Sequence, residues 1–163
     1  MTRFIFILLF ILLPFEIHAK AASAIKELEK NGGIISPTSD GGLRIEFQLS
    51  GRDLNDEGLE PIKSLESVKI LNLRDTKITN AGIIHIEGMK DLKRLHLERT
   101  QIDDTCIDYL TGLQELEYLN LYSTKVSDLG LSKLKNLKKL RKLYLWQTKV
   151  TNGGVKQLEA ALP

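Results

Sequence analysis

Apolar residues recur along the chain with a period of 24 residues, and the recurrence continues from residue 43 to near the C-terminus. The columns that repeat without a gap are Leu71, Leu95, Leu119 and Leu143; Leu73, Leu97, Leu121 and Leu145; Thr76, Thr100, Thr124 and Thr148; and Ile78, Ile102, Val126 and Val150. A period of this length is typical of solenoids, in which each unit buries its apolar face only against its neighbours. The pattern therefore predicts one stacked core that successive units share.

The order of residues within a unit predicts a short strand, a turn and a short helix. Leu119 and Leu121 are separated by one residue, so both point to one side of an extended strand while Asn120 and Tyr122 point to the other. Apolar residues at helical spacing follow the turn. At the start of each helix we expect a side-chain oxygen to cap the free backbone amides. The residues expected to supply it are Asn80, Asp104 and Asp128.

An atypical unit precedes the four regular ones, and a cap precedes that unit. Phe47, Leu49, Leu54, Asp56, Gly58 and Leu59 are expected to fill the repeat columns, with Arg52 in place of the threonine. Residues 22–30 are expected to form a helix that ends at Gly32 and Gly33. Ile34 and Ile35 are expected to pair with residues 43–49. The predicted fold is therefore α/β, a solenoid of about five 24-residue units with an N-terminal cap of helix plus hairpin.

The first residues have the pattern of a secretory signal peptide. Arg3 precedes an unbroken apolar run over residues 4–13, and a short polar stretch then ends at Ala19. This run is shorter than the roughly 20 apolar residues that a spanning helix needs, although an uncleaved membrane anchor is the alternative. We expect a signal peptide over 1–19, the cap over 20–42 and the repeat domain over 43–163. The mature chain would then be periplasmic or secreted, without a stable membrane span.

Composition narrows the range of partners and compartments only a little. The 163 residues suffice for one domain with a sizeable core, and 23 Lys plus Arg nearly balance 21 Asp plus Glu. The net charge of +2 gives no reason to expect nucleic acid as a partner. Cys106 is the only cysteine, so the chain has no internal disulfide. This fits a bacterial periplasm better than a small extracellular disulfide scaffold.

The repeat columns, written Leu-x-Leu-x-x-Thr-x-Ile/Val-x-Asp/Asn-x-Gly-Leu, resemble the leucine-rich repeats of bacterial, planctomycete-type exported proteins and, more distantly, those of F-box adaptor proteins. The resemblance covers Leu43 to Leu162. It implies a parallel sheet on a concave side, helices outside, and partners that are usually proteins. Arg52 and Cys106 depart from the pattern, at a threonine and a glycine position. No segment matches the ligase-binding part of F-box adaptors, and an exported chain argues against that role.

The outward positions of the strands form the candidate binding face. Four of the six aromatic residues that follow the signal peptide lie there, in the last two units. Tyrosine and tryptophan are enriched among residues that dominate binding energy, but aromatic residues on a strand also stabilise the sheet by cross-strand packing. Charged residues near the centre of this face could select a polar ligand or could form a solvated salt-bridge lattice. The candidate binding residues are Tyr118, Tyr122, Tyr144, Trp146, Arg74, Arg94, His96 and Glu98.

The sequence offers little basis for catalysis or for a cofactor or metal. His85 and His96 lack metal-ligand spacing with any cysteine or carboxylate cluster, and Gly153–Gly154 lies in the turn of a repeat rather than in a phosphate loop. Cys106 takes a small position that we expect to be buried, which favours an inert thiol over a nucleophile. We therefore expect no catalytic residue, no bound cofactor and no metal.

Two functions are consistent with these observations. The first is an exported, non-enzymatic recognition module that binds a protein or peptide, or a glycan, on the concave strand face. The alternative is a self-assembling structural envelope protein, because no further strand covers the last unit and its exposed edge could pair with another chain.

Overall fold

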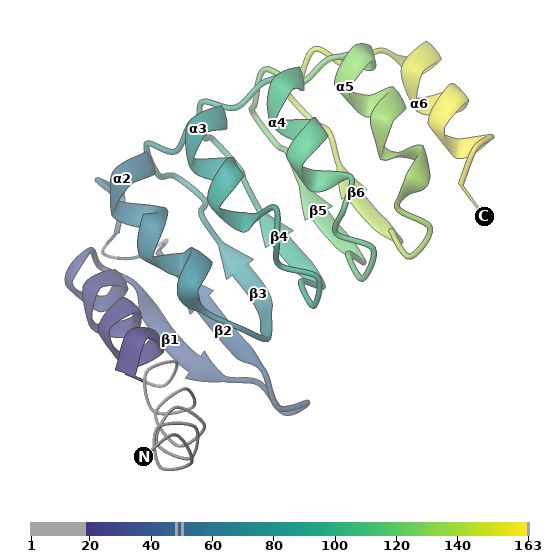
Figure 1. Cartoon of the computed structure of the whole chain (residues 1–163). Coiled ribbons are helices and arrows are strands. Elements are labelled where there is room, and N and C mark those ends of the chain that lie inside the picture. The colour runs from purple at the N-terminus through teal and green to yellow at the C-terminus, as the bar shows by residue number, and fades with distance from the viewer. Residues whose placement is uncertain (1–18, 48, 50, 163) are drawn as a thin grey trace, which may run out of the picture.

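A computed structural model describes residues 19–47, 49 and 51–162, which form a curved solenoid with strands along the inner side and helices along the outer side (Figure 1). The predicted signal peptide lies, apart from Ala19, outside the described residues. No helix among the described residues is long and apolar enough to cross a membrane.

Six strands form one sheet in the order of the sequence. They are β1 (Ile34–Pro37), β2 (Leu43–Glu46), β3 (Val68–Asn72), β4 (Arg94–His96), β5 (Tyr118–Asn120) and β6 (Lys142–Tyr144). The hairpin strands β1 and β2 are antiparallel, and β2 to β6 are parallel. Leu71, Leu95, Leu119 and Leu143 lie side by side in this register. The predicted fold class and the 24-residue period of the last four strands are confirmed.

Each parallel strand is followed by a short helical segment on the outer side of the curve (Figure 1). The α-helices are α2 (Asp56–Leu59), α3 (Asn80–Ile83), α4 (Asp104–Leu110), α5 (Asp128–Lys133) and α6 (Asn152–Glu159). Single 3-10 turns extend three of them: η1 (Glu60–Ser64), η2 (Ile84–Ile86) and η3 (Leu134–Asn136). Residues 19–30 are also helical and lie at the N-terminal end of the stack.

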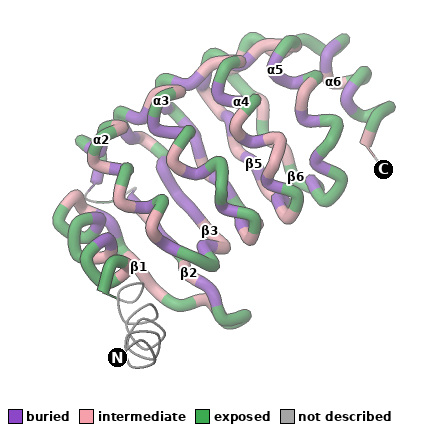
Figure 2. Tube along the Cα trace, viewed as in Figure 1, coloured by how far each residue is buried: buried purple, intermediate pink, exposed green. Residues whose placement is uncertain are grey.

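The core lies between the two layers and runs along the whole stack (Figure 2). Leu95, Leu97, Leu119 and Leu121 are fully buried. On the helix side, Ile83, Ile86, Leu131 and Leu134, which lie at helical spacing, are fully buried as well. The recurring threonines stabilise the turns that follow β3, β4, β5 and β6. In each turn the threonine hydroxyl donates to the backbone carbonyl three residues earlier. The hydroxyls of Thr76, Thr100, Thr124 and Thr148 lie 2.6, 2.7, 2.7 and 2.6 Å from those oxygens.

The N-terminal cap forms as predicted. Ile34 pairs with Glu46 and Ile35 with Ile45. The helix over residues 19–30 ends before Gly32, which adopts a positive φ of 88°. Gly33 has no room for a side chain, since a Cβ there would lie 2.8 Å from the Leu28 carbonyl oxygen. The helix and hairpin thus cover the first unit.

The predicted register of the first unit is wrong by two residues. Ile45, not Phe47, lies beside Leu71, and Phe47 donates its N–H to the Asn72 carbonyl, as Leu73 does one unit later. Leu49, which we expected in an inward column, is 74% exposed. The turn after β2 contains two extra residues, and the 24-residue period resumes at Leu54.

The outward-facing residues of the first unit are displaced by the same shift in register. Arg44 lies beside Ile70, and Glu46 lies beside Asn72. A uniform period of 24 would place Glu46 in one column with Ile70 and Arg94, and the register shift moves it to the next column.

The predicted helix caps are wrong by one position. The residues that cap the helices through their side chains are Asn55, Thr79, Asp103, Ser127 and Thr151, each one residue before the expected column. The expected column instead links neighbouring units. Asp104, for example, accepts the Ser127 backbone N–H at 2.7 Å and the Ser127 hydroxyl at 2.6 Å. Asp56 and Asp128 make the same two contacts with Thr79 and Thr151.

Candidate binding face

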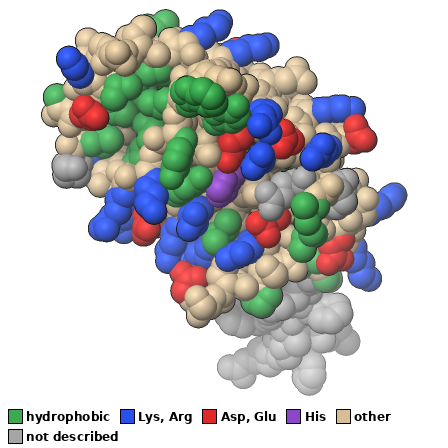
Figure 3. Space-filling view, turned by 180° about the vertical axis from the view of Figure 1, so that it is seen from behind, with side chains coloured by type: hydrophobic (Ala, Val, Ile, Leu, Met, Phe, Trp, Pro, Cys, Tyr) green, Lys and Arg blue, Asp and Glu red, His purple; other side chains and the backbone are tan. Residues whose placement is uncertain are grey.

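The strand register brings most of the predicted binding residues together. Arg94, Tyr118 and Lys142 lie side by side on β4, β5 and β6, and the next outward row contains His96, Asn120 and Tyr144. Seen from the side opposite Figure 1, hydrophobic side chains gather toward the C-terminal end of this face, beside Lys and Arg side chains (Figure 3). The geometry thus places an aromatic cluster next to cationic groups.

The first stack on this face joins a cation to two tyrosines. The guanidinium carbon of Arg94 lies 4.7 Å from the ring centroid of Tyr118, within cation–π range. The other neighbour of Tyr118 is Tyr144, with ring centroids 5.3 Å apart and an interplanar angle of 43°. His96 also contacts Tyr118, at 4.6 Å between centroids. Tyr118 is therefore enclosed by neighbouring units, whereas Tyr144 is 47% exposed.

A second stack has the same order. Arg99 lies over Tyr122 at 5.2 Å, and Tyr122 stacks on Trp146 at 5.5 Å with an interplanar angle of 16°. Trp146 is 73% exposed, so its ring is the largest free aromatic surface of the cluster. In both stacks the free surface belongs to the residue of the last unit.

Arg99, one of the charged residues expected near the centre of this face, is not among the candidate binding residues of the sequence analysis. It follows the outward Glu98 and so falls outside the alternation of the strand. It lies over Tyr122 because the turn takes a left-handed backbone, with φ of 55° at Arg99 and 60° at Asp75. The same φ recurs 24 residues apart at Ser123 and Gln147. None of these four is glycine, so composition gave no signal of the turn.

Asp75 ties the charged residues of the face together. Its carboxylate accepts hydrogen bonds from Arg99 at 3.0 Å and from Arg74 at 3.1 Å. Burial raises the pKa of Asp75, but these two guanidinium groups outweigh burial and leave the pKa below its ordinary value. Arg74 is therefore held in an ion pair. This part of the face is a salt-bridge lattice.

Glu98 is not presented to solvent. It is 6% exposed, and its Oε1 accepts a hydrogen bond from Asn120 Nδ2 at 2.7 Å and lies 3.1 Å from His96 Nδ1. Its Oε2 is buried without a hydrogen-bond partner among the described residues. Asn120 in turn accepts the backbone N–H of Tyr122 at 3.0 Å. Glu98 and His96 therefore form a layer beneath the rings and position them.

The described residues give little support for chemistry at this face. Burial and three nearby aspartates raise the pKa of Cys106 to about 12, so its thiol stays protonated. Cys106 lies in α4, on the helix layer rather than among the rings. Within the described ranges, no group of three or more His, Cys, Asp and Glu side chains could hold a metal ion.

Comparisons with known proteins agree with this architecture. Residues 90–150 match a family model described as leucine rich repeat, and residues 64–86 match a second model with the same description. Internalin C2 of Listeria monocytogenes is similar at 33% identity with a TM-score of 0.52, over 61% of this chain and 42% of that one. No curated protein matches this chain.

Two more distant structures show the fold alone. The internalin InlF of Listeria monocytogenes is 23% identical with a TM-score of 0.51, over 64% of this chain and 30% of that one. The C-terminal domain of tropomodulin from Caenorhabditis elegans is 13% identical with a TM-score of 0.54, over 87% of this chain and 90% of that one. This chain therefore spans less than half the length of the two internalin structures.

Proposed function

We propose that this chain, which is a leucine-rich-repeat protein, is an exported recognition module that binds a protein or peptide segment on its strand face. Leucine-rich-repeat domains are typically protein-binding modules and are generally non-catalytic. The proposed binding residues are the four rings of the two stacks: Tyr118, Tyr122, Tyr144 and Trp146. Arg94 lies over the ring of Tyr118, and Arg99 lies over the ring of Tyr122.

The observation that carries this proposal is the exposed stack of Tyr122 and Trp146. A large aromatic surface left in water is unfavourable unless a partner covers it. The stack is rigid before binding, because Arg99 fixes one side of Tyr122 and Asn120 fixes its backbone. Prior rigidity lowers the entropic cost of binding.

The size of the face limits the partner. Five parallel strands at about 4.8 Å spacing make a face roughly 20 Å long. A standard protein interface buries about 800 Å² on each partner. A single face of this size suits a short segment of a partner better than a whole protein surface.

Export is proposed from the apolar run over residues 4–13. A periplasmic or secreted chain would meet its partner in the cell envelope or outside the cell. A glycan is the competing ligand, since aromatic rings also stack on sugars.

The test is a pull-down from the envelope fraction of the source organism. We expect a protein that binds the wild-type chain and is lost from the variant with Tyr122→Ala and Trp146→Ala. Leu129→Ala is the matched control, because Leu129 is an exposed apolar residue on α5, away from the strands. Thermal unfolding shows whether the variants fold.

A partner that binds the double variant as well as the wild type would show that the rings are structural only. A partner released by soluble glycan, rather than by protease treatment of the fraction, would identify the ligand as a glycan.

A further inference from the structure

The C-terminal end of the solenoid has an open strand edge. Leu73, Leu97 and Leu121 donate their N–H groups to the carbonyls of the following strand, at 2.9, 2.9 and 3.0 Å. Leu145 holds the equivalent position in the last unit, and β6 is the last strand of the sheet among the described residues. Its N–H therefore faces the open edge, which can template pairing with another strand.

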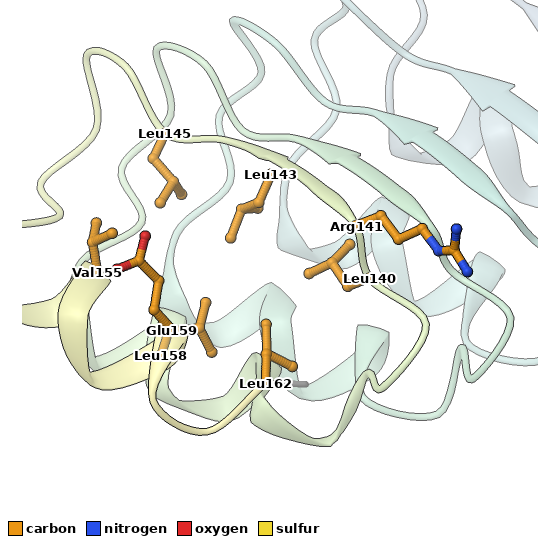
Figure 4. Close-up of a pocket in the computed structure, with 8 residues that line it drawn as sticks. All are labelled: Leu140, Arg141, Leu143, Leu145, Val155, Leu158, Glu159 and Leu162. Atoms are coloured by element: carbon orange, nitrogen blue, oxygen red, sulfur yellow. The ribbon is translucent and has the colours of Figure 1, made fainter.

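An apolar cavity of about 490 Å³ lies behind this edge, between β6 and α6 (Figure 4). Its apolar lining consists of Leu140, Leu143, Leu145, Val155, Leu158 and Leu162. Arg141 and Glu159 complete its lining with one charge of each sign. In the inner units the equivalent leucines are fully buried, whereas Leu143 and Leu145 are only partly buried. The core is thus unsealed on this side.

The side chains along the edge have an order that complements itself. Lys142-Leu143-Tyr144-Leu145-Trp146 is nearly symmetric about Tyr144. If a second copy pairs antiparallel with Tyr144 opposite Tyr144, Leu143 lies opposite Leu145 and Lys142 lies opposite Trp146. The leucine pairs would cover both cavities, and each lysine would lie over a tryptophan in a cation–π contact. No like charges would face each other.

The backbone supports the same register. Edge-facing N–H groups alternate along a strand, and Leu145 carries one of them, as does Leu143 two residues earlier. In antiparallel pairing of Leu143 with Leu145 of the second copy, the Leu145 N–H of each copy donates to the Leu143 carbonyl of the other, whereas the Leu145 carbonyl stays bonded to Thr148 within its own turn. Tyr144 then forms a non-hydrogen-bonded pair across the axis.

We propose that two copies of this chain associate through β6, antiparallel about a two-fold axis at Tyr144. The two six-stranded sheets then form one continuous sheet. Closed two-fold pairing is the commonest form of oligomer and leaves no edge at this end. Head-to-tail pairing of β6 with β1 is disfavoured, because Pro37 on β1 has no N–H to donate.

The first test is the mass of the purified protein by sedimentation velocity over a concentration series. We expect the wild type to reach twice the mass of one chain as it is purified. Tyr144→Lys and Tyr144→Glu each place two like charges opposite one another, so each variant should remain at the mass of one chain. A mixture of the two variants should regain the double mass, because lysine then lies opposite glutamate. Leu129→Lys, which adds a charge away from the edge, should keep the double mass.

The second test fixes the register. Opposite residues in a non-hydrogen-bonded antiparallel pair have Cα atoms about 4.5 Å apart, which a disulfide can bridge. Tyr144→Cys should therefore cross-link to itself on oxidation with diamide. Lys142→Cys should not, but it should cross-link to Trp146→Cys in a mixture. The native Cys106 is buried and should not interfere.

Three results would overturn the proposal: a wild type that stays at the mass of one chain at every concentration, charge variants that still dimerise, or Lys142→Cys that cross-links to itself. A chain that keeps the mass of one chain on its own, and gains mass only when an envelope protein is added, would overturn the pairing of two copies and identify a foreign strand as the occupant of the edge. The proposed recognition function is tested separately by the pull-down, because sedimentation of the purified chain involves no partner. The Tyr144 variants are not used to test recognition, since Tyr144 is one of the proposed binding residues.

Discussion

Glu98 differs most from the other residues of its column. The column also contains Arg74, Tyr122 and Trp146, and Glu98 alone among the four is buried. A buried carboxylate is costly unless hydrogen bonds compensate for the lost water. Asn120 and His96 supply that compensation to one oxygen only. Glu98 therefore organises its neighbours rather than presenting its charge.

This role predicts different effects for two substitutions at Glu98. Glu98→Ala leaves the amide of Asn120 without its acceptor, and we expect a loss of about 1 to 3 kcal/mol in the free energy of unfolding. Glu98→Gln keeps an acceptor oxygen for Asn120, so its loss should be clearly smaller. Urea denaturation followed by circular dichroism measures both values. Equal losses would show that the negative charge, rather than the hydrogen bond, matters.

Burial at Glu98 could not be predicted from the sequence, although its place on the outward face could. The alternation of the strand assigns a face, but burial on that face depends on the side chains of the neighbouring units. His96 and Asn120 lie on adjacent strands and close over the carboxylate. The aromatic stacks were more predictable, because the period of 24 places Tyr122 beside Trp146 directly.

The link between units explains why glycine recurs at one position of the helix, as Gly82, Gly130 and Gly154. A Cβ at Gly130 would overlap the carboxylate of Asp104 in the preceding unit, and the backbone N–H of Gly130 donates to that carboxylate at 3.1 Å. The third unit is the exception. Asn80 replaces the aspartate in the unit before it, and Cys106 replaces the glycine. The Cys106 N–H donates instead to the carbonyl of Asp103, the N-cap of its own helix. The cysteine thus occurs where the carboxylate is absent.

We predict that Gly130→Ala destabilises the protein by about 1 to 3 kcal/mol, the usual range for overpacking. Asp104→Ala removes the overlapping carboxylate, so the double variant should lose less than the sum of the two single losses. Gly153→Ala is the matched control, because a Cβ there meets nothing closer than 3.4 Å. That variant should be neutral or slightly stabilising. Strict additivity of Gly130→Ala and Asp104→Ala would contradict the proposed contact.

Both errors in the predicted elements have a physical origin. Asp103 and Asp104, like Thr151 and Asn152, place two capping oxygens in succession, so composition cannot choose between the two columns. In the first unit, Ile45, Phe47 and Leu49 alternate with polar residues, and a slip of two keeps every apolar residue on the same face. Only packing against the next strand fixes that register.

The whole molecule is a one-dimensional stack, in which the core of each unit packs against that of its neighbours. The helix and hairpin cover the first unit, whereas the last unit has one neighbour within the part of the chain that the structure describes. The leucines of one column therefore differ in burial. Leu121 has a unit on either side and is fully buried, whereas Leu145 borders the open cavity. The contribution of an equivalent leucine to the free energy of unfolding should therefore decrease toward the C-terminal end.

This gradient predicts unequal effects for two chemically identical substitutions. Leu121→Ala should cost about 2 to 5 kcal/mol, the range for large-to-small changes in a core. Leu145→Ala should cost clearly less, because the side chain already borders open space and its loss leaves less of a cavity. Both are measured by urea denaturation in the Tyr144→Lys background, so that pairing between copies does not stabilise Leu145. Equal costs would show that the last unit is as tightly packed as the inner ones, and a near-zero cost for Leu121→Ala would contradict the stacked core itself.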